Sequence, residues 1–155
     1  MDAGSIAFMI ICAGLVFLMT PGLAFFYGGL GRRKNVINTM MMCAIPIAVG
    51  SVMWMIFGYS LSFGGSGSLI GNFSHLFFNG VSDSASTRGL AIPDALFAAF
   101  QMMFPIITVA ILTGAAAGRM RFTPLVIFVV LWLLVVYFPF AHMVWDEGLL
   151  AQWGT

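Results

Sequence analysis

Long uncharged, apolar stretches dominate this chain, with short charged segments between them. The first stretch runs from Ala3 to Gly31 and exceeds the roughly 20 residues that an α-helix needs to cross a bilayer. Only 7% of the 155 residues are charged, whereas about 25% is usual in a soluble domain. Because a soluble fold has no means of hiding so much apolar surface, the sequence predicts an integral membrane protein.

Four such stretches predict four transmembrane α-helices. We expect spans over residues 5–30, 36–63, 94–118 and 123–145, and an outer loop over 64–93 that is rich in Gly, Ser, Asn and Asp. Asp94 is expected to cap the third span, and Pro124 suits the first turn of the fourth. Backbone polar groups inside a bilayer must be paired internally, and the stretches lack the alternation of barrel strands. The predicted fold class is therefore an all-α, polytopic membrane protein.

The positions of Lys and Arg predict the orientation, because basic residues accumulate in short cytoplasmic loops. Arg32, Arg33 and Lys34 lie between the first two spans, and Arg119 and Arg121 lie between the last two. The other side receives the remaining arginine, at position 88, and all five acidic residues. We therefore expect a multi-pass protein of the cell membrane with both ends of this chain outside.

Few residues in the spans are suited to acid–base chemistry. The span interiors contain no Asp, Glu, Lys or Arg, which argues against a proton pump. His142 lies near the outer end of the fourth span, where hydrogen bonding is a better expectation than catalysis, and lining of a vestibule stays open. No enzyme motif is found, so neither an enzyme nor a cofactor is expected. The net charge of +1 gives no reason to expect nucleic acid.

Aromatic residues near the outer ends of two spans are candidates for a binding site. Phe100 and Phe104 are four residues apart and so share one helix face, and Trp145 ends the fourth span. One interpretation is an aromatic belt that anchors the protein at the membrane surface. The other is a cation site, because aromatic faces attract a cation by about 0.5–2 kcal/mol without any fixed negative charge.

Several motifs are similar to those of the Amt/Mep/Rh family of ammonium transporters. The matching blocks, in order, are Met19–Leu30 with Arg32–Val36, then Trp54 with Phe57–Leu61, then Phe100–Phe104 with Ile106–Thr108, and finally Pro139 with Ala141–Trp145. The resemblance covers nearly the whole chain, but only the first four of about eleven spans in this transporter architecture. It implies that residues 1–155 are a partial domain of the eleven-helix fold.

The resemblance also implies a function and site residues. Members of the family form homotrimers with a pore through each subunit, and they recruit ammonium against aromatic rings outside a phenylalanine gate. Phe104 matches the aromatic that belongs to both the recruitment site and the gate, while Phe100 and Trp145 match recruitment-site aromatics. The second gate phenylalanine and both pore histidines would lie beyond Thr155, and His142 matches neither histidine. The expected partners are ammonium or ammonia, the lipid bilayer, further copies, and a chain that carries the missing helices.

Three departures from the family pattern bear on these expectations. Asp146 and Glu147 stand where two glycines are usual, Gly118 replaces an acid, and Pro105 follows Phe104 in place of a small residue. The two acids would either attract cations to the mouth or reflect relaxed selection in a fragment. Pro105 removes a backbone donor, with a shift of the gate ring as an expected effect.

Two functions follow from the sequence. The first is ammonium transport by cation–π recruitment and a hydrophobic pore, here in an incomplete chain. The alternative is a non-conducting product, either a truncated or split-gene fragment or an ammonium-sensing relative. Uptake of an ammonium analogue by the inserted chain would separate the two.

Overall fold

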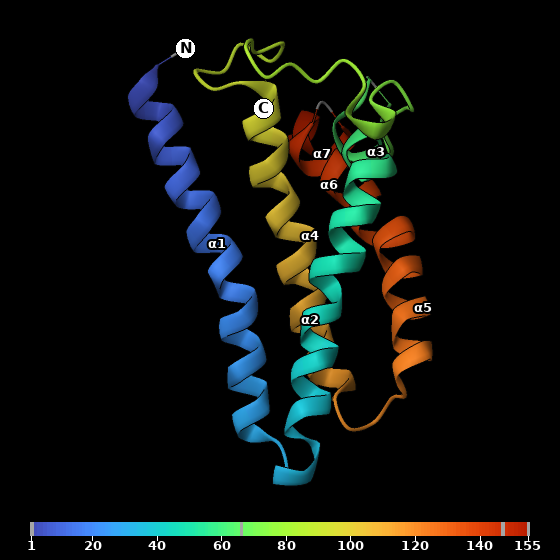
Figure 1. The fold of residues 1–155 in the computed structure, drawn as a ribbon. Helices are drawn as coiled ribbons and strands as arrows, with labels where there is room; N and C mark the ends of the chain where they lie inside the picture. The colour runs from blue at the N-terminus through green and yellow to red at the C-terminus, as the bar shows by residue number, and fades with distance from the viewer. Residues whose placement is uncertain (1, 66, 147, 155) are drawn as a thin grey trace.

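The computed structural model describes residues 2–65, 67–146 and 148–154 as a bundle of long helices joined by short turns and one long loop (Figure 1). The helical segments are α1 (Ala3–Leu30), η1 (Arg33–Asn35), α2 (Val36–Met53), η2 (Trp54–Gly58), α3 (Tyr59–Phe63), η3 (Leu76–Phe78), α4 (Asp94–Ala116), α5 (Phe122–Trp132), η4 (Leu133–Tyr137), α6 (Phe138–Trp145) and α7 (Leu149–Trp153). These residues include no strand. The predicted all-α fold class is confirmed.

The chain has four helical segments that are long and apolar enough to cross a membrane. They are α1, the continuous run of α2, η2 and α3, then α4, and the run of α5, η4 and α6 that continues towards α7. The two basic connections lie at one end of the bundle, and both chain ends and the long loop lie at the other (Figure 1). The α1 helix packs against α2 and α4, and α2 also packs against α5.

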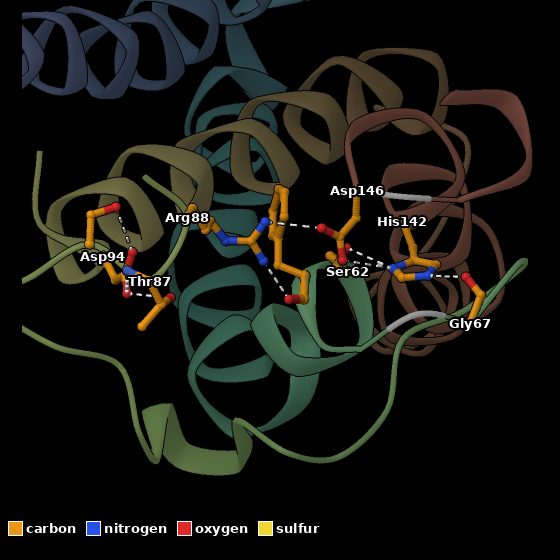
Figure 2. Close-up of polar contacts among 9 residues, drawn as sticks. Ser62, Gly67, Thr87, Arg88, Asp94, His142 and Asp146 are labelled. Atoms are coloured by element: carbon orange, nitrogen blue, oxygen red, sulfur yellow. Dashed lines mark hydrogen bonds and ion pairs between the residues drawn. The ribbon is translucent and has the colours of Figure 1, made fainter. Parts of the chain in front are cut away.

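The aspartates at two helix starts have different roles. Asp2 caps α1, because its carboxylate accepts a hydrogen bond from the backbone N–H of Ser5 at 2.8 Å, and this bond lowers the pKa of Asp2 below its ordinary value. Asp94 does not cap α4 as expected. It is the first helical residue, after Pro93, and its buried carboxylate accepts bonds from the backbone N–H and hydroxyl of Thr87 (Figure 2). Asp94 therefore fastens the long loop to α4.

Two π-helical turns, η2 and η4, lie within the second and fourth spans, and residues around them form the core. Trp54 of η2 is fully buried, and its indole N–H donates to the carbonyl of Ala98 at 3.1 Å. The ring of Phe138, just after η4, lies 6.0 Å from the rings of both Trp54 and Phe57. This aromatic core joins the outer halves of the second and fourth spans to α4.

Gly58 permits the close contact between these two spans. A Cβ at Gly58 would lie 2.7 Å from Cζ of Phe138, and overpacking of this kind costs about 1–3 kcal/mol. We expect Gly58→Ala to lower the thermal midpoint of the detergent-solubilised chain. Gly29→Ala is the matched control, because a Cβ there meets nothing within 4 Å. Equal midpoints for the two variants would show that Gly58 is not needed for this packing.

Candidate functional site

Three aromatic side chains come together near the end of the bundle that carries the long loop. The ring centroids of Phe100 and Phe104 are 5.1 Å apart, and those of Phe104 and Trp145 are 5.7 Å apart. Both pairs meet edge to face, at 77° and 68°. Phe104 thus lies between the other two rings, and Trp145 remains 47% exposed. The three residues singled out in the sequence therefore form one partly open cluster from α4 and α6.

His142 fixes the end of α6 that carries Trp145. The imidazole is fully buried, with Nδ1 at 3.1 Å from the carbonyl oxygen of Ser62 and Nε2 at 2.6 Å from that of Gly67 (Figure 2). Both partners are backbone carbonyls, which accept hydrogen bonds from ring N–H groups. His142 thereby ties α6 to the end of α3 and to the start of the long loop.

Asp146 is paired on both sides. Its carboxylate lies 2.9 Å from the guanidinium of Arg88 and 3.5 Å from Nδ1 of His142 (Figure 2). Arg88 also donates to the carbonyl of Phe63, and its guanidinium carbon lies 5.0 Å from the centre of the Phe63 ring. Asp146 is therefore no free negative charge at the mouth, and its part of the predicted cation attraction is not supported. Glu147 lies outside the described residues.

Arg88 stays charged despite being half-buried. Burial acts to lower the pKa of its guanidinium, but the hydrogen bond and charge of Asp146 outweigh this effect and place the pKa above its ordinary value. The Arg88–Asp146 pair has side chains that are 24% and 11% exposed. The Arg88 guanidinium, which comes from the long loop, is thus held against Asp146, the residue that follows Trp145.

Pro105 leaves α4 continuous. The helix runs from Asp94 to Ala116 through the proline, although Pro105 cannot donate to the carbonyl of Gln101. The neighbouring carbonyl of Phe104 accepts a hydrogen bond from the Thr108 hydroxyl at 2.6 Å. The Phe104 ring keeps its contacts on both sides.

An apolar hollow of about 470 Å³ adjoins the cluster on the α6 side. Trp145, Thr108 and Tyr137 line it together with apolar residues of the fourth span. The Tyr137 hydroxyl and the amide oxygen of Gln101 are buried and have no hydrogen-bond partner among the described residues. Apart from Thr108 and Tyr137, the hollow is lined by apolar and aromatic side chains, which suits a site that attracts cations through aromatic faces.

Sequence reasoning missed the polar residues that hold the cluster. Arg88 and Asp146 are far apart in the chain, and the partners of His142 are backbone carbonyls, which no side chain reveals. One signal was available: Arg88 is the only basic residue outside the two basic connections. A single arginine in a segment with several acids indicates an ion pair.

The fold defines a multi-pass α-helical membrane protein. Residues 7–155 match the family model described as Ammonium Transporter Family, so the chain belongs to that family. The resemblance seen in the sequence motifs is confirmed.

Relatives of known name and solved structures agree with this assignment. An ammonium transporter of Bacillus subtilis is 46% identical over 155 residues, which are 100% of this chain and 38% of the relative. Ammonium transporter 2 of Schizosaccharomyces pombe is 42% identical over 95% of this chain and 29% of its own length. The crystal structure of Candida albicans Mep2 matches 98% of this chain and 34% of its own with a TM-score of 0.87 at 29% identity. This chain thus spans well under half the length of these relatives.

Proposed function

We propose that this chain forms the outer recruitment site and part of the conduction path of an ammonium transporter. The observation that carries the proposal is the packing of Phe104 between Phe100 and Trp145, with the Trp145 ring partly open. Membership of the family supplies the substrate class. Phe100, Phe104 and Trp145 are the residues that we assign to ammonium binding.

Recruitment in this proposal uses ring faces in place of a carboxylate. A cation within about 6 Å of a ring centre is attracted by the ring quadrupole, most strongly by Trp. The Trp145 ring is 47% exposed and so can meet a ligand, and the carboxylate of the next residue, Asp146, is already paired with Arg88. The site therefore favours a small cation that can shed its water over one that needs charged oxygen ligands.

Phe104 also serves as the gate in this proposal. Its ring contacts Trp145 on one side, and Trp145 lines the apolar hollow beside α6. A cation recruited at the cluster must lose water to pass a ring of this kind, because an apolar passage offers no hydrogen-bond partners. Deprotonation or desolvation at this point would precede movement through a hydrophobic path.

Other parts of the protein complete the path. The chain covers 38% of the Bacillus subtilis relative, and we propose that later helices supply the facing wall, either in the same polypeptide or in a companion chain. We further propose assembly as a homotrimer, with both ends of this chain outside and the two basic connections in the cytoplasm. The unpartnered Tyr137 and Gln101 groups beside the cluster support a further wall there.

Uptake of labelled methylammonium tests the proposal. Cells without their own ammonium transporters would express this chain alone, the later helices of a relative alone, or both together, after membrane insertion is verified. We expect saturable uptake only with both. Uptake by this chain alone would overturn the incomplete-path proposal, and no uptake in any combination would overturn the transport proposal.

Sensing is the second candidate function. The solved structure named Sensor Amt Protein matches 92% of this chain with a TM-score of 0.79 at 27% identity. Ammonium would then bind at the aromatic cluster without crossing. Methylammonium binding to well-inserted protein that shows no uptake with the later helices present would favour sensing over transport.

A further inference from the structure

A second pocket lies at the opposite end of the bundle from the aromatic cluster, between the ends of α1, α2 and α4. Its volume is about 570 Å³, within the range of small-ligand sites. Its lining includes Tyr27, Leu30, Arg32, Asn35, Thr39 and Arg119. Nothing in the proposed recruitment site uses this pocket.

The charges around this pocket are all positive. Arg32, which follows α1, and Arg119, which follows α4, both line the pocket. Neither guanidinium has an ion pair or hydrogen bond among the described residues. The acidic residues that the structure describes, Asp2, Asp83, Asp94 and Asp146, lie in or beside the segments at the other end of the bundle. Gly118 also lines the pocket, so an acid there, as the family pattern has, would place a carboxylate beside Arg119.

The inner wall of the pocket adds hydrogen-bond donors. Thr39 is 5% exposed, lines the pocket, and has no hydrogen-bond partner for its hydroxyl among the described residues. Asn35 immediately precedes α2, and its side chain makes no capping hydrogen bond to that helix, so its amide is also available. A negatively charged oxygen would meet donors on several sides, and hydrogen bonds of charged groups are roughly twice as strong as neutral ones.

The shape of the pocket favours a lipid over a free anion. It opens at the end of the transmembrane helices, and Leu30 in its wall is 72% exposed. Gly114 shapes the opposite wall, because a Cβ there would overlap the ring of Tyr27. An apolar rim beside a basic interior suits a molecule with a phosphate head and acyl chains.

We propose that this pocket binds the phosphate headgroup of an anionic phospholipid from the leaflet at this end of the molecule. Arg32 and Arg119 pair with the phosphate, and the Thr39 hydroxyl and Asn35 amide donate to its oxygens. The acyl chains then run along Leu30 and the neighbouring helix surfaces. The proposal is independent of ammonium transport, because it rests on residues at the far end of the bundle.

Lipid binding to the detergent-solubilised chain tests the site, with short-chain phosphatidylglycerol as the probe and native mass spectrometry as the readout. We expect Arg32→Gln/Arg119→Gln to weaken binding about tenfold or more, the effect of losing charged hydrogen bonds. The matched control is Arg33→Gln/Arg121→Gln, which removes the same charge from the same connections but outside the pocket lining. The control should change binding less than about twofold.

Two further probes separate the possible sources of the phosphate chemistry. Phosphatidylcholine should bind at least about tenfold more weakly than phosphatidylglycerol, because its net charge is zero. Inorganic phosphate at the same concentration should not displace the lipid. Equal losses in the two double variants would overturn the site in favour of diffuse surface attraction, and displacement by inorganic phosphate would overturn its assignment to a lipid.

Thr39→Val tests the buried part of the site without any change of charge. The substitution keeps the side-chain shape and removes the hydroxyl, so binding of phosphatidylglycerol should weaken by about three- to tenfold. Thr108→Val, whose hydroxyl bonds to Phe104 far from the pocket, should leave lipid binding unchanged. Unchanged binding in Thr39→Val would contradict a headgroup that reaches the inner wall.

Discussion

Replacement of Trp145 by Leu is expected to raise the methylammonium concentration that gives half-maximal uptake by about 2- to 30-fold. This range corresponds to a loss of about 0.5–2 kcal/mol of cation–π attraction. Leu keeps an apolar side chain against Phe104 but has no ring quadrupole. The measurement is labelled methylammonium uptake in the combination of this chain with the later helices.

Trp153→Leu is the matched control for this variant. Trp153 is 75% exposed at the end of α7, and it makes no ring contact within the described residues. The Trp153→Leu variant removes the same kind of ring from the same end of the protein but leaves the aromatic cluster intact, so uptake should be unchanged. A similar rise in both variants would show that Trp145 acts only as a membrane anchor, which is the aromatic-belt interpretation.

Replacement of His142 by Phe is expected to destabilise the protein by about 2–5 kcal/mol. The substitution leaves the carbonyls of Ser62 and Gly67 without their donor, and each unmet buried group costs about 1–3 kcal/mol. It also removes the second partner of Asp146. A fall of the thermal midpoint by at least about 5 °C in detergent is the expected readout.

The other histidine provides the control. His75 is only partly buried, and its Nδ1 contacts the carbonyl of Asn79 four residues away. His75→Phe keeps an aromatic ring against Tyr59, so its midpoint should fall by no more than about 2 °C. If His142→Phe were equally mild, the buried contacts of His142 would not hold α6 in place.

The sequence predicted the class of fold because the bilayer imposes its own rules. Uncharged stretches of sufficient length must be helical when they cross lipid, so four long helices followed from composition alone. The π-helical turns η2 and η4 did not follow, since no residue type marks a turn that widens by one residue. The role of Asp94 was also misread, because its partners come from the loop before it.

The candidate site was only partly visible in the sequence. Helical spacing placed Phe100 beside Phe104. The sequence grouped Trp145 with them by its place near the outer end of a span and by the family resemblance, but it could not show the contact with Phe104, because that contact joins distant segments. The pairing of Asp146 with Arg88 needed the three-dimensional path of the long loop. Acidic residues at the mouth of a pore suggest, from the sequence alone, a field that attracts cations. Here the Arg88 guanidinium lies within hydrogen-bonding distance of the Asp146 carboxylate and offsets its negative charge.

The π-helical turn η4 has a consequence for how the fourth span tolerates changes in length. A wide turn holds one more residue than an α-helical turn, so loss of one residue within Leu133–Tyr137 lets the turn tighten while the helix on either side keeps its facing. Loss of one residue in α5 instead rotates everything beyond it by about 100°. A single-residue gap between relatives is therefore compatible with an intact aromatic cluster when the gap falls within η4, because this turn holds one residue more than an α-helical turn.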